Sequence, residues 1–244
     1  PFFTISLLLA GFSSFEVLAY RWGIASLTLV VFGIMLGETF RISRKDWGTV
    51  FILSLLRAAT SFSLVIAYQN IASGVASTIH FMYPVLTTLI MMIFFHEKKS
   101  LWRMAAIALA VAGVFFLSNG DGTGSVTWSG IFIVLLSALG YALYLVTVSQ
   151  LKNLEMKGLK MTFYVFLFGG ILLFTGTEIS GIGLQAIPDR TTLGNLVMLA
   201  LVPTVISNLA LVRAIKNIGS TLTSVLGAME PVTAVCVGIA IFGE

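Results

Sequence analysis

The segment 67–97 is repeated at 214–244, and this repeat constrains the fold more than any other feature of the chain. Pro84 and Pro231 are 147 positions apart (231 − 84 = 147), and each lies inside an apolar run that ends in a glutamate, Glu97 or Glu244. Identical residues recur at the same offset without a gap: Asn70/Asn217, Ile71/Ile218, Ser73/Ser220, Ser77/Ser224, Met82/Met229, Val85/Val232 and Phe95/Phe242. Shared composition alone does not place polar landmarks and a proline at one spacing, so the sequence indicates an internal duplication.

The composition predicts an integral membrane protein in contact with a lipid bilayer. Of 244 residues, 58% are apolar and only 10% are charged, whereas a soluble domain carries about a quarter charged residues. The net charge of +4 would favour a nucleic-acid partner in a soluble protein, but here the positions of the charges matter more. We therefore predict no nucleic-acid partner. A single cysteine, Cys236, excludes an intramolecular disulfide and a cysteine metal cluster, and we predict no metal and no cofactor.

The apolar runs predict membrane-spanning helices, since about 20 apolar residues cross the hydrocarbon and no run shows the alternation of a strand. The predicted spans are 1–10, 16–36, 47–68, 73–95, 101–118, 128–150, 159–176, 193–213 and 220–242. The first reads as the second half of a helix, and the chain stops where the ninth ends. We therefore expect an all-α membrane protein, an inverted repeat of two five-helix bundles, with the first span truncated and the tenth absent.

The distribution of basic residues predicts the topology. If every predicted span crosses, 11 of the 14 basic residues fall on one side, with the remaining loops holding only Arg190. Basic residues collect in cytoplasmic loops, so we expect a multi-pass protein of a bacterial-type inner cell membrane with a cytoplasmic N-terminus. Pro84 and Pro231 are then five crossings apart, so the two copies are inverted. Inverted repeats are typical of secondary transporters, whose site lies near the midplane between the repeats.

Several short motifs resemble the EamA type of the drug/metabolite transporter superfamily. Helices of that family end in an FGE-like step, matched by 242–244 and nearly by 95–97, and carry the mid-helix proline. Arg21-Trp22 and the stretch 128–144 are also similar, although the family often has Trp at the position of Tyr141. The resemblance covers nearly the whole chain and implies a ten-helix permease exporting small metabolites or amino acids. It divides the chain into a first EamA-like repeat at 1–118, a linker at 119–127 and a second repeat at 128–244.

Ionisable residues inside apolar helices are costly, about 2.5–3.5 kcal/mol at the bilayer centre on insertion scales, so each is a candidate for function. Arg57 lies about halfway along its span and could bind a substrate carboxylate. Glu230 directly precedes Pro231, and a buried carboxylate suits proton coupling. A structural Arg57–Glu230 pair explains both residues equally well. His80 lies four residues before Pro84, whose missing N–H leaves the His80 carbonyl without its helical partner; a packing role is the alternative.

Polar residues elsewhere in the spans complete the predicted substrate site. Tyr83, Tyr141 and Tyr144 offer flat faces and hydroxyls, with core packing or an interfacial belt as the alternative. Asn208 occupies the repeat position of Ser61, where interhelical hydrogen bonding competes with cavity lining. We expect Arg21 to reach the membrane surface or to pair with Glu16. Glu97 and Glu244 end their helices at opposite faces, and we expect them to accept hydrogen bonds from the start of another helix, fixing a gate.

The sequence favours a secondary active transporter that exports amino acids or related zwitterionic or anionic solutes by alternating access. A multidrug efflux permease of the same fold is the alternative, followed by a channel or a receptor. No HExxH motif, cysteine cluster or nucleophile elbow is present, so we do not expect an enzyme. The expected partners are a small-molecule substrate, the bilayer and a proton as coupling ion. A homodimer is also possible on the sequence alone, which does not determine the oligomeric state.

Overall fold

The computed structural model describes residues 2–71, 73–97, 105, 109, 127–151, 158–181 and 183–227. Within them every regular element is helical, and six helical runs are long and apolar enough to cross a membrane. The predicted all-α membrane fold is therefore confirmed. Apart from residues 105 and 109, the predicted span 101–118 lies outside the described residues, and so do the end of the ninth span, Glu230, Pro231 and Glu244.

The helices follow the predicted spans closely. Their bounds are α1 (Phe2–Leu9), α2 (Ser14–Met35), α3 (Asp46–Asn70), α4 (Ser73–His80), α5 (Tyr83–Phe94), α7 (Trp128–Gln150), α8 (Gly158–Ile179), α9 (Arg190–Ala200), a π-helix (Leu201–Ile206) and α10 (Ser207–Gly227).

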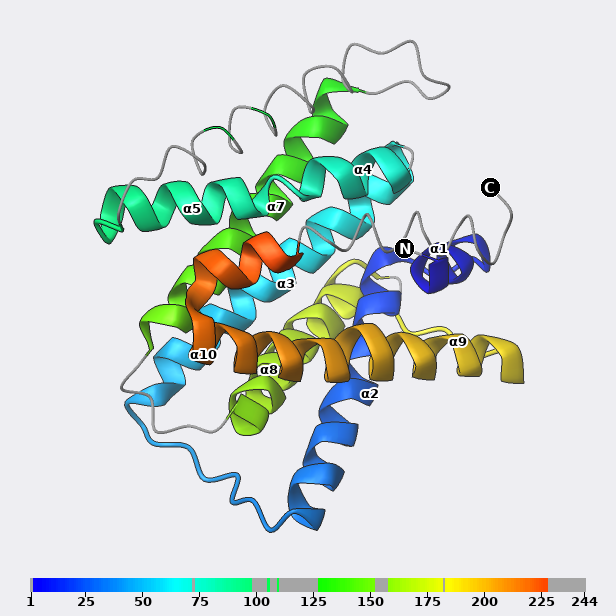
Figure 1. Ribbon diagram of the computed structural model, residues 1–244. Helices are drawn as coiled ribbons and strands as arrows, with labels where there is room; N and C mark the ends of the chain where they lie inside the picture. The colour runs from blue at the N-terminus through cyan, green and yellow to red at the C-terminus, as the bar shows by residue number, and fades with distance from the viewer. Residues whose placement is uncertain are drawn as a thin grey trace, which may run out of the picture.

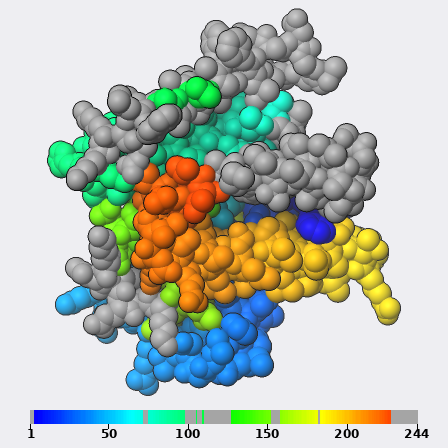
Figure 2. Space-filling view, viewed as in Figure 1, coloured from blue at the N-terminus to red at the C-terminus, as the bar shows by residue number. Residues whose placement is uncertain are grey.

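The packing of the helices reproduces an inverted repeat. α1, α2 and α3 of the first copy correspond to α7, α8 and α9 of the second. α3 packs against α8 and, in the equivalent contact, α2 packs against α9; α3 also packs against α7, and α9 equivalently against α1. α2 and α8, which are counterparts, pack against each other. The run from α9 to α10 crosses over α2 and α8 (Figure 1), and it forms the yellow-to-orange face seen in Figure 2. The two copies thus interlock.

The predicted span 73–95 is broken rather than continuous. α4 ends at His80 and α5 begins at Tyr83, with Phe81 and Met82 in a turn between them. Pro84 has no N–H to donate to the carbonyl of residue 80, so the helical ladder is interrupted at that point. The Met82 N–H instead donates to the Ile79 carbonyl in a tighter turn, at 3.0 Å. The apolar composition is continuous across the break, so the segment was predicted as one span, although Pro84 lies next to the point where the helix is interrupted.

The predicted spans 193–213 and 220–242 are joined by helix instead of a loop. α10 stays helical past residue 213, up to Gly219, where the backbone turns sharply (φ +82°, ψ 169°). Glycine adopts this left-handed φ without the steric cost that other residues incur. At its other end the run begins at Asp189, which accepts hydrogen bonds from the Thr192 N–H and hydroxyl. These bonds lower the pKa of Asp189, so this N-cap is lost only as the pH falls through that lowered value.

Glu16 is a buried carboxylate that attaches the loop before α9 to the start of α2. Ser13 and Glu16 form a capping box, in which the Ser13 N–H donates to Glu16 Oε2 at 2.8 Å. The Gln185 N–H donates to Glu16 Oε1, also at 2.8 Å. Glu16 is fully buried, so both of its oxygens are satisfied by backbone groups rather than by water. Of the two alternatives for Arg21, the pair with Glu16 is not formed, because the Arg21 Nε donates to Thr204 Oγ1 instead.

Replacing Glu16 with alanine is expected to lower the melting temperature of the detergent-solubilised protein by about 5–10 °C. The change removes two hydrogen bonds to a charged acceptor, worth about 3 kcal/mol together, and each kcal/mol shifts the melting of a chain of this size by about 2–4 °C. Glu178→Ala, at an exposed glutamate of α8, is the matched control and should melt like the parent. Tryptophan fluorescence during heating measures both, and equal melting of the two variants would contradict the role given to Glu16.

Candidate functional site

Arg57 lies against the faces of two tyrosines in the middle of the bundle. It is residue 12 of the 25-residue α3 (57 − 46 + 1 = 12). Its Cζ lies 4.9 Å from the ring centroid of Tyr141 and 5.8 Å from that of Tyr144, both on α7. Aromatic faces attract a cation and stabilise it when water is scarce. The Arg57 Nε is buried and has no hydrogen-bond partner among the described residues, so this cation retains a donor for an anionic group.

His80 and Tyr83, at the break between α4 and α5, complete the same cluster. The His80 ring stacks on Tyr141 with centroids 5.8 Å apart and planes at 24°, and Tyr83 meets Tyr141 edge-on at 4.7 Å. The rings of Tyr141 and Tyr144 are nearly parallel at 6.3 Å. Tyr141 is therefore shared by a guanidinium, an imidazole and two phenols. Of the seven predicted site residues, the structure brings five together: Arg57, His80, Tyr83, Tyr141 and Tyr144.

The hydrogen bonds of Ser137 define which nitrogen of His80 carries a proton. The Ser137 hydroxyl donates to the Thr60 carbonyl oxygen at 2.7 Å, and a hydroxyl has only one proton to give. At its 3.3 Å contact with His80 Nδ1, the Ser137 oxygen must therefore accept. Nδ1 then bears hydrogen in the neutral ring, and the lone pair is on Nε2.

A cavity of about 280 Å³ lies beside this cluster, lined mainly by α7 and α10 of the second repeat, with Tyr83 from the first repeat at its wall. Tyr83 from the first repeat and Tyr141 from the second line one part of it, and α10 supplies the hydroxyls of Ser207, Thr223 and Ser224. Gly227 packs directly against Tyr83: a β-carbon at position 227 would lie 2.1 Å from the Tyr83 hydroxyl oxygen, so only glycine fits here. The volume of about 280 Å³ is just below the usual range for ligand pockets, which is about 300–1,000 Å³, and suits a small solute.

Two predicted site residues are not part of the cluster that the structure shows. Asn208 is buried on α10, where its Nδ2 donates to the Thr204 carbonyl at 2.8 Å. Its Oδ1 has no hydrogen-bond partner within the described part of the chain. Its neighbour Ser207, rather than Asn208, lines the cavity. Glu230 lies outside the described residues, so its pairing with Arg57 stays a prediction.

Arg21 makes a contact that the sequence did not predict. Its Nε donates to Thr204 Oγ1 at 2.5 Å, in the π-helix of the other repeat, and not to Glu16. Pro203 lacks an N–H for the carbonyl of Leu199, and the Thr204 hydroxyl donates to that carbonyl instead, at 2.7 Å. The irregular helix thus leaves Thr204 able to accept from Arg21. Pro203 was the available signal, since a proline inside a helix frees a carbonyl.

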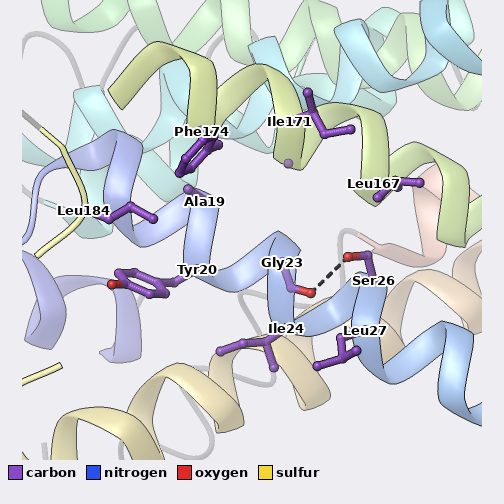
Figure 3. A pocket seen from close by; sticks show the side chains of 11 residues that line it. Ala19, Tyr20, Gly23, Ile24, Ser26, Leu27, Leu167, Ile171, Phe174 and Leu184 are labelled. Carbon is purple, nitrogen blue, oxygen red and sulfur yellow. Dashed lines mark hydrogen bonds between the residues drawn. The ribbon is translucent and has the colours of Figure 1, made fainter. Parts of the chain in front are cut away.

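A second groove lies between α2 and α8 and is not the candidate site. It measures about 410 Å³ (Figure 3) and is almost wholly apolar. Its lining contains repeat counterparts that are 147 positions apart: Tyr20/Leu167, Gly23/Gly170, Ile24/Ile171 and Leu27/Phe174. The groove therefore lies on the pseudo-twofold axis that relates the two copies. Because its apolar lining offers little to a charged solute, the smaller polar cavity is the better candidate.

Interlocked inverted repeats with a polar cavity that both of them line define a multi-pass membrane protein of the transporter class. The EamA-like transporter family matches the chain twice, at residues 2–119 and 128–244. The chain therefore belongs to the EamA-like transporter family, within the drug/metabolite transporter superfamily. Membership of this family and the apolar helices make the protein a membrane transporter.

Individual relatives agree with this family. The uncharacterized inner membrane transporter YedA of Escherichia coli K12 is 25% identical over 225 residues, which cover 92% of this chain and 72% of YedA. The uncharacterized transporter YdfC of Bacillus subtilis 168 is 25% identical over 239 residues, covering 97% and 76% respectively. A solved structure titled "Crystal structure of protein" superimposes on this chain with a TM-score of 0.71 and 17% sequence identity. The match covers 98% of this chain and 84% of the chain in that structure. This last likeness supports the fold alone.

Proposed function

We propose that the protein is a secondary active transporter that exports small metabolites, in particular amino acids or related zwitterionic and anionic solutes, by alternating access. The observation that carries the proposal is the buried Arg57 Nε without a partner among the described residues, held on tyrosine faces beside a cavity that both repeats line. A carboxylate is the group that best satisfies a buried guanidinium. The hydroxyls of α10 would meet the remaining polar groups of the solute.

The second candidate is a multidrug efflux permease, which the apolar groove between α2 and α8 favours. Hydrophobic and cationic drugs need apolar surface more than they need a guanidinium. Arg57 opposes a cationic drug at the polar cavity. The two candidates therefore differ in the sign of the charge that the carrier accepts.

A proton is the proposed coupling ion, with His80 and Glu230 as the residues that bind it. His80 supports this role, because its Nδ1 contact with Ser137 leaves Nε2 as the basic nitrogen. The repeat boundaries at 118 and 128, the cytoplasmic N-terminus and a homodimer stay predictions of the same proposal. The charge distribution supports the orientation, since most basic residues fall in the loops assigned to the cytoplasm.

Counterflow in proteoliposomes tests the transport proposal. A thermal-shift screen of amino acids and small organic acids identifies a stabilising solute, since a ligand at 100 times its Kd stabilises by about 2.7 kcal/mol. Vesicles loaded with that solute should then accumulate the labelled solute transiently and saturably. A pore would give non-saturable equilibration, and uptake of hydrophobic cations without any acidic or zwitterionic solute would support the multidrug alternative instead.

A further inference from the structure

A hydrogen bond joins the two repeats at one end of the cavity helices. The Thr221 hydroxyl donates to Glu97 Oε2 at 2.6 Å. Glu97 lies just after α5 in the first repeat, and Thr221 lies in α10 of the second repeat, two residues after the turn at Gly219. α5 and α10 also pack against each other. The sequence-based expectation that Glu97 accepts a hydrogen bond from the start of another helix is confirmed.

Two unusual backbone positions bring these groups together. His96 has φ +52° and Gly219 has φ +82°, both in the left-handed region. His96 ends the first segment and directs Glu97 away from the α5 axis, and Gly219 starts a new helical segment at Ser220. The first N–H groups of that segment have no helical partners, and its N-terminus carries partial positive charge that favours a carboxylate. Ser220 Oγ is buried without a partner among the described residues, which adds a second donor at this end.

The contact lies at one end of the candidate cavity. Thr223 and Ser224 line the cavity and follow Thr221 within a single helical turn. Lys98 and Lys99 directly follow Glu97 in the sequence, and Lys216 precedes Thr221 by five positions. The distribution of basic residues therefore assigns this end to the cytoplasmic side. Whatever separates Glu97 from Thr221 would loosen the α5–α10 contact beside the cavity.

We propose that the Glu97–Thr221 hydrogen bond is a latch that closes the cytoplasmic end of the transport cavity and opens in the alternate state. This inference rests on the proposed transport function. Glu244 holds the matching sequence position in the second copy, but the counterpart of Thr221 in the first copy is Gly74, which has no hydroxyl, so this latch is specific to one end. The latch belongs to the conformational cycle and does not touch the substrate.

Labelling of an introduced cysteine tests the latch without any substrate. Cys236→Ser removes the single native cysteine, and Ala214→Cys places a thiol in the cavity lining. A membrane-impermeant maleimide is added to the cytoplasmic face of inverted vesicles that carry the full-length protein. Thr221→Val and Glu97→Ala should each raise the labelling rate by about tenfold, the effect expected from losing one hydrogen bond to a charged group. Glu97→Gln, whose neutral amide oxygen still accepts a weaker hydrogen bond, should label at a rate between those of the parent and Glu97→Ala.

Thr175→Val is the matched control, since Thr175 is exposed and bonds only within α8. It should leave the labelling rate unchanged. Unchanged labelling in both Thr221→Val and Glu97→Ala would overturn the latch, even if transport is measured. Faster labelling in a protein that shows no carrier activity with any solute would support the latch and reject the proposed function. The experiment therefore distinguishes failure of the latch proposal from failure of the proposed transport function.

Discussion

Replacing Arg57 with alanine is expected to reduce carrier flux in proteoliposomes by about 10- to 150-fold while the protein stays folded. The variant removes the buried cation that lies on the faces of Tyr141 and Tyr144. A hydrogen bond to a charged group contributes about 1.5–3 kcal/mol, which corresponds to about 10- to 150-fold in affinity. Flux of the solute found by the thermal-shift screen, and the loss of its stabilising effect, measure the result.

Two further variants separate charge from geometry. Arg57→Lys keeps the charge but loses the planar group that lies on both rings, so intermediate flux is expected. Arg44→Ala, at an exposed arginine, is the control and should transport like the parent. Glu230→Gln should also abolish flux if Glu230 carries the coupling proton. Normal flux in both Arg57→Ala and Glu230→Gln would remove these residues from the site.

The free-energy cost of placing ionisable groups in the bilayer identified two of the site residues. Arg57 and His80 were candidates because an ionisable side chain in an apolar helix needs a polar partner. The structure supplies that partner as tyrosine faces. Tyr141 and Tyr144 are three residues apart in the predicted span 128–150 and Tyr83 lies in the predicted span 73–95, but the sequence does not show that they meet. Helical periodicity predicts which side chains share a face of one helix. It does not predict which faces of different helices meet, so Asn208 could not be separated from the cluster in advance.

The contacts that were hardest to predict from the sequence are those that depend on irregular backbone. Arg21 bonds to Thr204, 183 positions away, only because the π-helix at Leu201–Ile206 leaves the Thr204 hydroxyl available. A π-helix has no periodic signature in the sequence, and such insertions often mark functional sites. The turn at Gly219 fell inside the predicted junction between residues 213 and 220, but the helix that continues up to it was not predicted. In contrast, the long spans were predictable because the bilayer imposes length and apolar composition on every crossing.

The contact between Trp22 and Gly169 gives the largest expected effect on stability. A β-carbon at Gly169 would lie 1.9 Å from Cζ3 of Trp22 and 2.5 Å from Cε3. Trp22 is only 1% exposed and also packs edge-on against Phe166, with ring centroids 5.2 Å apart. The indole therefore has no free volume into which it can move. α2 belongs to the first repeat and α8 to the second. If the two helices are pushed apart at this contact, the packing of both repeats is disturbed.

Gly169→Ala is accordingly expected to lower the melting temperature in detergent by about 5–10 °C, or to prevent folding. Overpacking costs about 1–3 kcal/mol or more, and each kcal/mol shifts the melting of a chain of this size by about 2–4 °C. Gly23→Ala is the matched control, because Gly23 lies on the same interface with nothing within 4 Å of an added β-carbon. The double variant Trp22→Leu/Gly169→Ala should lose less stability than the sum of its single changes, since the smaller side chain makes room for the methyl group. Equal melting of Gly169→Ala and Gly23→Ala would show that α2 and α8 do not pack through this contact.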